Sequence, residues 1–391
     1  MWIRDSTNQI KPYLRFVNDD IELKDLIFGV IQVQATYLNY DPYANAFLKP
    51  CVVWESKYEL DSIGHFFQLT NEYLKATGEY DRVFKSKVWT TAIPRIFKVL
   101  QTQMQDTWPS KQLKLPNIKV MNSKDPQPVL LEDGYRFRRQ TDRPTETLGE
   151  YGIGGITKRC GLIRSAFRPS DDATTLPYLI PANALVSSQL KQLSEYVNLY
   201  LSKHPENDNT EFFDDLKNKA GKLSKTIKRA IFKHAVIDHP EFGRVFAYEV
   251  DCYGSHLIMD DANTPSLLSM PLFGFVATTD KIYQNTRKMI LSEWNPWFFQ
   301  SEFGKGIGSP HTGQNMIWPL SLLMQLQTTT SEAEVKEALL TVKKIANVTG
   351  GLMCESIDVN KPDKYTRPWF SWANSVAGET ILQLKEKYSD L

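Results

Sequence analysis

Several carboxylates in this sequence stand in loop-like segments beside arginines and aromatic residues, instead of on charged helix faces. Asp171 and Asp172 follow an Arg-Pro-Ser run, and Glu355 ends a glycine-bearing, apolar stretch. Hydrolysis of a glycosidic bond needs one carboxyl that stays protonated, to donate to the leaving oxygen, and a second that stays ionised, to act on water or on the sugar. These residues therefore predict glycosidase chemistry.

The Asp171–Asp172 pair suits the role of proton donor. Two adjacent acids make it hard for both to ionise, and Ser170 is expected to cap a helix that follows. Spacing alone leaves a plain capping acid as the alternative for this pair, and it leaves Glu355 open between structure and function. Glu379 is expected to be structural, on a C-terminal helix.

Two further acidic clusters have the composition of a sugar-binding site. Arg4 and Asp5 follow Trp2, and the run Asp-Asp-Ala-Asn occupies positions 260–263. Asp and Asn side chains hydrogen-bond to vicinal hydroxyls, arginine supplies a planar fork of donors, and aromatic faces cover the apolar side of a sugar ring. Each cluster alone is weak evidence, but together they favour a carbohydrate substrate.

The motifs of several other chemistries are missing. No Gly-x-Ser-x-Gly elbow and no Walker or dinucleotide pattern is present, so the glycine clusters at 152–155 and 304–308 are expected to form tight turns. There is no His-x-x-x-His pair and no EF-hand spacing. The sequence therefore predicts neither a metal nor another cofactor.

The composition argues against nucleic acid and a membrane span as partners of this chain. Lys and Arg number 46 and Asp and Glu 45, giving a net charge of +1, without the basic surplus that binding to a phosphate backbone needs. The longest apolar stretches are far shorter than the ~20 residues of a membrane-spanning helix. The four cysteines fit no zinc motif, and their pairing cannot be read from the sequence.

Most of the segments between the candidate site residues have the apolar spacing of α-helices. Apolar residues recur at three and four positions through segments such as 21–33 and 182–201, and we count roughly ten predicted helices. The run 243–250 reads as a local hairpin, and 123–158 as an ordered insertion or lid. The long polar loops of antiparallel helix pairs closed into a ring would meet on one face, so we expect one all-α domain over 1–391.

The sequence resembles glycoside hydrolase family 125 along nearly its whole length. The resemblance lies in seven blocks, which follow one another in the family's order: 1–7, 41–47, 54–62, 165–173, 259–263, 306–312 and 366–374. It implies an (α/α)6 toroid of helical hairpins. It also implies an inverting, metal-independent exo-α-1,6-mannosidase that acts on α-mannoside glycans.

The same blocks imply roles for individual residues. Asp171, the first Asp of Arg-Pro-Ser-Asp-Asp, would be the general acid, and Glu355 the general base that activates water. Inversion asks for about 6.5 to 9.5 Å between the two carboxyl groups, so that water fits. The candidates for holding the mannose ring are Arg4, Asp5, Asp61, Arg168, Asp172, Asp260, Asn263, His311, Arg367 and Trp372.

Three departures from the family pattern stand out. Arg164 stands where bacterial members of the family have a Trp, and Cys354 stands where a His is expected beside the base; either change can alter the sugar subsite or the pKa of the base. Family members also carry an upstream segment before the first block, so the chain is expected to be N-terminally truncated, with exposed apolar surface.

Alternatives remain at this stage. One is an inactive, glycan-binding relative, another a related glycosidase with a different sugar or linkage, and a third a calcium-dependent inverting mannosidase. The natural glycan and oligomeric state cannot be read from the sequence. The sequon at Asn347 permits secretory passage but is too common to show it. The fungal style of the blocks favours the secretory pathway or the extracellular space.

Overall fold

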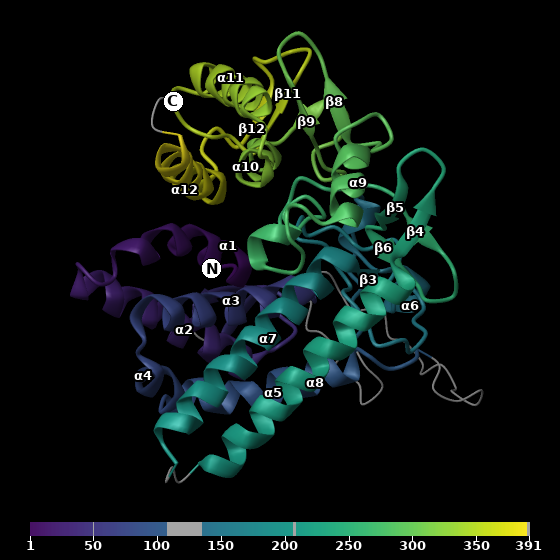
Figure 1. Ribbon diagram of the computed structural model, residues 1–391. Helices are drawn as coiled ribbons and strands as arrows, with labels where there is room; N and C mark the ends of the chain where they lie inside the picture. The colour runs from purple at the N-terminus through teal and green to yellow at the C-terminus, as the bar shows by residue number, and fades with distance from the viewer. Residues whose placement is uncertain (50, 108–134, 206–208, 389–391) are drawn as a thin grey trace. The chain divides into compact units, whose positions relative to one another are not determined.

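The computed structural model describes residues 1–49, 51–107, 135–205 and 209–388 (Figure 1). The chain divides into two compact units. Unit 1 holds residues 1–234 and 249–256, and unit 2 holds 235–248 and 257–391. The first part of the expected lid, 123–134, lies outside the described residues; the rest, from Tyr135 on, packs in unit 1. None of the described helices is long and apolar enough to cross a membrane.

Unit 1 is mainly helical. Its α-helices are α1 Ile3–Ile10, α2 Ile21–Tyr40, α3 Leu60–Thr77, α4 Tyr80–Phe84, α5 Lys87–Thr102, α6 Gly149–Gly152, α7 Ile180–Lys203 and α8 Thr210–His234. The 3-10 helices are η1 Lys11–Phe16 and η2 Pro144–Glu146, and the strands are β1 Ala46–Lys49, β2 Val52–Glu55, β3 Tyr178–Leu179 and β6 Glu249–Val250. Short β7, His256–Leu257, lies at the boundary of the units.

Unit 2 combines four helices with short strands in its described part. Its helices are α9 Lys281–Ile290, α10 Pro319–Thr328, α11 Glu332–Val348 and α12 Ser371–Lys387, with the 3-10 helix η3 Met270–Phe273. The strands are β4 Val236–His239, β5 Gly243–Phe246, β8 Phe298–Gln300, β9 Lys305–Ile307, β10 Met316–Ile317, β11 Ser356–Asp358 and β12 Tyr365–Thr366. The antiparallel β4–β5 pair confirms a local hairpin for the first part of the predicted run, 243–246, but β6 at its end pairs instead with β3.

The α7–α8 pair forms a long antiparallel hairpin, visible in Figure 1. Ser187 and Ser224 each donate a hydroxyl hydrogen bond to the other's carbonyl oxygen, at 3.0 and 2.7 Å, and Ser194 donates to Lys217 in the same way. On its other side α7 packs against α3. A Cβ at Gly64 would lie 2.8 Å from a methyl of Leu185, so glycine is what permits this close approach.

Helix α1 is an element that apolar periodicity did not predict. Its buried positions are largely polar: besides Ile3 they are Arg4, Thr7 and Asn8. Tertiary hydrogen bonds hold it in place, because Gln34 of α2 donates to the Ile3 carbonyl at 3.2 Å and Thr7 donates to the backbone of α3. The helix therefore brings Arg4 to the start of α3.

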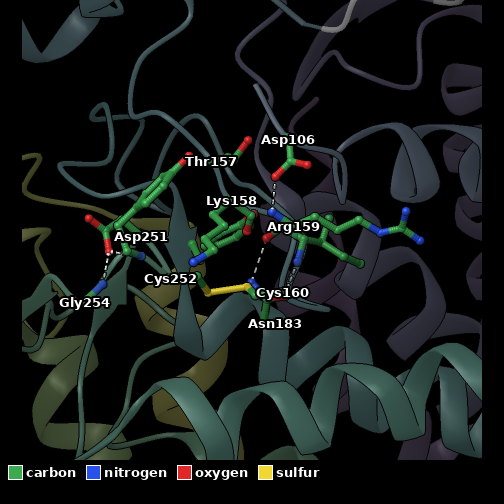
Figure 2. Close-up of a disulfide and its surroundings, with 12 residues drawn as sticks. Asp106, Thr157, Lys158, Arg159, Cys160, Asn183, Asp251, Cys252 and Gly254 are labelled. Carbon is green, nitrogen blue, oxygen red and sulfur yellow. Dashed lines mark hydrogen bonds between the residues drawn. A yellow bond between two sulfur atoms is a disulfide. The ribbon is translucent and has the colours of Figure 1, made fainter. Parts of the chain in front are cut away.

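A disulfide joins Cys160 to Cys252, which are 92 residues apart (Figure 2). Cys51 and Cys354 are thiols. Cys252 comes two residues after β6, and Cys160 comes shortly before the segment that leads to Asp171. The His234 ring lies close to both sulfurs, but sulfurs joined to each other are not available as thiolate ligands.

Removing this disulfide is expected to destabilise unit 1. Closing a loop of this length lowers the entropy of the unfolded chain, so Cys160→Ser with Cys252→Ser is expected to lower the free energy of unfolding by about 3 kcal/mol. Urea unfolding of oxidised protein measures the loss, with Cys51→Ser, which changes an exposed thiol, as the control. Equal stabilities of wild type and the double variant would contradict the prediction.

Candidate functional site

In unit 1 the predicted residues gather around one buried arginine. Arg4 is 3% exposed, and its guanidinium contacts four carboxyl groups. Their oxygens lie 2.6 Å away for Glu59, 3.3 Å for Asp61, 3.4 Å for Asp5 and 3.4 Å for Asp171. Segments far apart in the sequence thus bring the predicted acid together with three other carboxyl groups.

Burial opposes ionisation of the carboxyl groups in this cluster. It raises the pKa of Asp61 to about 6, although Arg4 acts in the opposite direction, and it raises the pKa of Glu59 well above its usual range. His65, hydrogen-bonded to the Asp61 carbonyl, has its pKa lowered to about 3 by burial and is therefore neutral at physiological pH. Burial thus favours the protonated form of Glu59 most strongly, whereas Asp61 is mostly ionised at pH 7.

The segment 168–172 carries the predicted acid in a tight loop. The Arg168 amide donates to the Asp172 carbonyl at 2.7 Å, and the Asp171 amide donates to the Arg168 carbonyl at 2.9 Å. Asp171 has a φ of 67°, in the left-handed region that Asp tolerates better than most residues. Its side chain is 28% exposed, which leaves it accessible to a ligand.

The prediction that Ser170 caps a following helix is wrong. The chain from Ser170 to Leu179 forms turns and a short strand, and α7 begins only at Ile180. The Ser170 hydroxyl instead donates to the Asp172 carboxylate at 2.8 Å. The left-handed backbone at Asp171 is the physical reason, because an α-helix cannot continue through it.

Glu249 of β6 holds the segment 168–176 through hydrogen bonds to one side chain and two backbone amides. Its carboxylate accepts from Arg168 Nε at 2.6 Å and from the amides of Thr175 and Leu176, both at 2.9 Å. Arg168 and Glu249 are both almost fully buried. Arg168 therefore supports the acid loop through a buried ion pair; its predicted contact with the sugar stays a prediction, as does that of the buried Asp172.

In unit 2 the backbone around the predicted base, Glu355, is held by hydrogen bonds to the segment 366–367 and to α12. Glu355 is 5% exposed and comes directly before β11. Its amide donates to the carbonyls of Thr366 and Arg367 at 3.1 and 3.2 Å, and its Oε1 forms an ion pair with Arg367 Nε at 3.4 Å. The preceding Met353 is held by Asn374 of α12 through two hydrogen bonds, of 3.0 and 2.8 Å.

Two other predicted blocks are joined in unit 2. Asn263 donates to Asp261 at 2.9 Å, and Ser309 donates to the other oxygen of Asp261 at 3.1 Å. Asp260 accepts from the amides of Leu267 and Leu268, at 2.8 and 3.0 Å, while burial raises its pKa to about 8. Asp260 thus shapes the 260–268 loop; a contact with the sugar stays a prediction for it.

The remaining candidates of unit 2 differ in exposure. The Arg367 side chain is 61% exposed, with a left-handed backbone, and His311 is half-buried with its ring near Trp318. Trp372 is only 2% exposed and packs against Phe370 in the first turn of α12. The exposed aromatic residue of this segment is Trp369, at 62%, which the sequence did not single out.

Both substituted positions are buried. Cys354 lies in the apolar cluster with Ile345 and Ile357, and burial raises the pKa of its thiol to about 12. A neutral thiol therefore replaces the ring expected beside the base. Arg164 is 7% exposed and donates to the Tyr135 carbonyl; burial lowers its pKa, and neighbouring tyrosine side chains oppose that change.

Sequence reasoning missed three polar residues of unit 1: Asn45, Glu59 and Glu249. Asn45 and Glu59 stand inside the blocks 41–47 and 54–62, so those blocks held the signal, but nothing in the spacing ranked them above their neighbours. Glu249 is an acid near the end of the mainly apolar strand-like run 243–250. An unpaired charge at a buried strand position predicts a buried partner, and that was the available clue.

A separate hollow of about 540 Å³ lies between α7 and α8. It contains none of the predicted site residues. Its lining is polar and includes four basic residues: Ser194, Glu195, Asn198, Lys217, Asn218, Gly221, Lys222, Lys225 and Arg229.

Comparison with known proteins identifies relatives of the chain. Residues 1–382 match glycoside hydrolase family 125, described as metal-independent α-mannosidases. The chain is 43% identical to the meiotically up-regulated gene 157 protein of Schizosaccharomyces pombe, a match that covers 99% of this chain and 75% of that protein.

Solved structures show the same fold. An α-mannosidase from Streptococcus pneumoniae, in a non-productive complex with α-1,6-mannobiose, has a TM-score of 0.86 at 33% identity, covering 99% of this chain and 86% of that one. A bacterial glucoamylase complexed with acarbose has a TM-score of 0.55 at 13% identity, covering 98% of this chain and 48% of that one, which shows the fold alone. The all-α (α/α)6 prediction is confirmed. The chain belongs to glycoside hydrolase family 125, the metal-independent α-mannosidases.

Proposed function

We propose that this protein is an exo-acting α-1,6-mannosidase that removes terminal mannose from glycans with inversion. The main support is the family match over residues 1–382, together with the related S. pneumoniae protein that binds α-1,6-mannobiose. The partly exposed Asp171, set in a cluster of buried carboxyl groups, supports the acid half of the mechanism.

The proposed reaction is a single displacement. Asp171 donates its proton to the glycosidic oxygen as the bond to C1 breaks. Glu355 removes a proton from water as that water attacks C1 from the opposite face, which yields β-mannose. The ion pair with Arg367 supports this role, because a carboxylate is the form that can accept the proton.

Proton NMR of α-1,6-mannobiose during hydrolysis by the wild-type chain tests this proposal. We expect β-mannose to appear first, with slower hydrolysis of α-1,2- and α-1,3-mannobiose and no loss of activity in the presence of a chelator. Initial α-mannose would overturn the single displacement, and loss of activity on chelation would indicate a calcium-dependent reaction. Binding of mannobiose without turnover would identify a glycan-binding relative.

We also propose that the protein passes through the secretory pathway. The sequon at Asn347 lies exposed in the last turn of α11, and the Cys160–Cys252 disulfide suits an oxidising compartment. N-glycosylation at Asn347 would support this route; it is detected as an electrophoretic shift that an N-glycosidase and Asn347→Gln each remove. The absence of this shift in protein expressed in a eukaryotic host would contradict the proposed route.

A further inference from the structure

Glu59, which lies immediately before α3, has the closest contact to Arg4 in the unit 1 cluster. It is 2% exposed, and its Oε2 accepts from Arg4 Nη1 at 2.6 Å and from Ser62 Oγ at 3.3 Å. Its Oε1 accepts from Asn45 Nδ2 at 3.1 Å. A carboxyl group held this closely is a defined part of the cluster and not a solvated surface acid.

Asp171 receives hydrogen bonds from the same two side chains. Its Oδ1 accepts from Asn45 Nδ2 at 3.3 Å and from Arg4 Nη2 at 3.4 Å. Asn45 and Arg4 therefore bridge Glu59 and Asp171, because each donates to both carboxyl groups. Two carboxyl groups that share the same donors at such short range repel each other when both are ionised, which favours a proton on one of them.

The charges around Glu59 favour this proton. Lys57 and Arg139 both pair with Glu55, at 3.3 and 3.0 Å, and His65 is neutral. Among the ion pairs of the described residues, Arg4 is the cation that contacts Glu59, Asp61, Asp5 and Asp171. The titratable and charged groups on the elements packed around Glu59 are Arg4, Asp5, Glu55, Lys57, Asp61, His65 and Asp171. Full ionisation of those four acids in a buried cluster is strongly disfavoured.

We propose that Glu59 is a positioning residue that shares one proton with Asp171, so that the acid of this enzyme is a Glu59–Asp171 carboxyl pair bridged by Arg4 and Asn45. This inference rests on the proposed function, in which Asp171 is the proton donor. Burial, which raises the pKa of Glu59, is consistent with it.

The pair explains how an acid beside an arginine can stay protonated. A guanidinium alone favours the ionised form of a carboxyl group, whereas a second carboxyl group opposes it. When Asp171 carries the shared proton, Oδ2 is the oxygen that bears it, because Oδ1 accepts from Arg4 and Asn45. When that proton moves to the glycosidic oxygen, the pair gains one negative charge beside Arg4, and solvent returns the proton after product leaves.

The pH dependence of kcat/KM for Glu59→Gln tests the pair, because glutamine keeps an acceptor for Arg4 but cannot share a proton. We expect the basic limb of the profile to move down by about one pH unit or more, since Asp171 then faces Arg4 without the second carboxyl group. At pH 7.5, kcat for α-1,6-mannobiose is expected to fall at least about tenfold. Hydrolysis of a dinitrophenyl α-mannoside, whose leaving group needs no proton, is expected to change less than about threefold.

Glu79→Gln is the matched control. Glu79 also pairs with an arginine in unit 1, Arg82 at 3.2 Å, but contacts none of the predicted site residues. Its pH profile is expected to equal that of wild type. The inference would be overturned if Glu59→Gln left the basic limb of the pH profile in place. It would also be overturned if Glu59→Gln lowered kcat equally for α-1,6-mannobiose and the dinitrophenyl α-mannoside. Either result would leave the proposed function intact.

Thermal unfolding measures the pair without catalysis, and so decides the question even if wild type hydrolyses no mannoside. Because the pKa of Glu59 is raised in the folded chain, wild type should lose stability relative to Glu59→Gln as pH rises above about 4.3, the value of an unfolded Glu. Asp171→Asn removes the sharing partner, so this pH-dependent gap in Tm is expected to shrink in that background. Equal gaps in both backgrounds from pH 4.5 to 8 would overturn the shared proton.

Discussion

Glu355→Gln is expected to lower kcat for α-1,6-mannobiose about a thousandfold, because water then lacks the carboxylate that removes its proton. Asp171→Asn is expected to cause a loss of similar size, for lack of a proton on the leaving oxygen. The two roles separate with a dinitrophenyl α-mannoside. Asp171→Asn should hydrolyse it at a rate close to that of wild type, whereas Glu355→Gln should stay inactive, since a better leaving group does not activate water.

Steady-state kinetics of both variants with both substrates measures these effects. Glu379→Gln, a change of an acid on α12, is the control and is expected to retain full activity. Each variant should unfold at a temperature close to that of wild type, which excludes misfolding as the cause. Inactivity of Asp171→Asn towards both substrates, with the fold intact, would contradict its assignment as the acid.

Glu249→Gln is expected to lower the free energy of unfolding by about 3–5 kcal/mol, because it leaves the Arg168 guanidinium buried without its counter-ion. The same change loosens the loop that carries Asp171, so kcat for mannobiose is expected to fall as well. Replacing Arg168 and Glu249 together by Met should cost less stability than the single change, since no buried charge then remains unpaired.

Urea unfolding of the single and double variants measures this coupling. Glu195→Gln is the matched control: Glu195 pairs with Lys191 at 3.6 Å, but both side chains are more than half exposed. Water and salt screen such pairs, so the control is expected to remain within about 0.5 kcal/mol of wild type. A loss of stability in Glu249→Gln no larger than that of the control would show that the buried pair does not stabilise the loop.

The helical class of the fold was determined by local patterns. Long stripes of apolar residues predicted α2, α7, α8 and α11, because each helix buries one face and a period of 3.6 residues records that face in the sequence. The apolar pattern did not predict helix α1, because its buried face includes the polar residues Arg4, Thr7 and Asn8. Hydropathy alone assigns such residues to the surface. Only tertiary partners make those polar side chains buried.

The backbone conformation of the segment 168–172, which carries Asp171, could not be predicted from local sequence patterns either. Serine followed by two acids is a common start for a helix, yet the left-handed backbone of Asp171 prevents one here. Bonds within the loop and the Glu249 carboxylate on β6 hold this conformation. The partner of Cys160 was also undetermined by the sequence, since a separation of 92 residues carries no pairing signal.

The sequence by itself therefore determined the residue types of the site and, through its ordered blocks, the family; the tertiary structure decided how those residues are held. Asn45, Glu59 and Asp171 belong to three separate segments, and only folding brings them to the guanidinium of Arg4. Because burial and neighbouring charges decide which of these carboxyl groups keeps a proton, their chemistry depends on three-dimensional contacts that spacing along the chain does not contain.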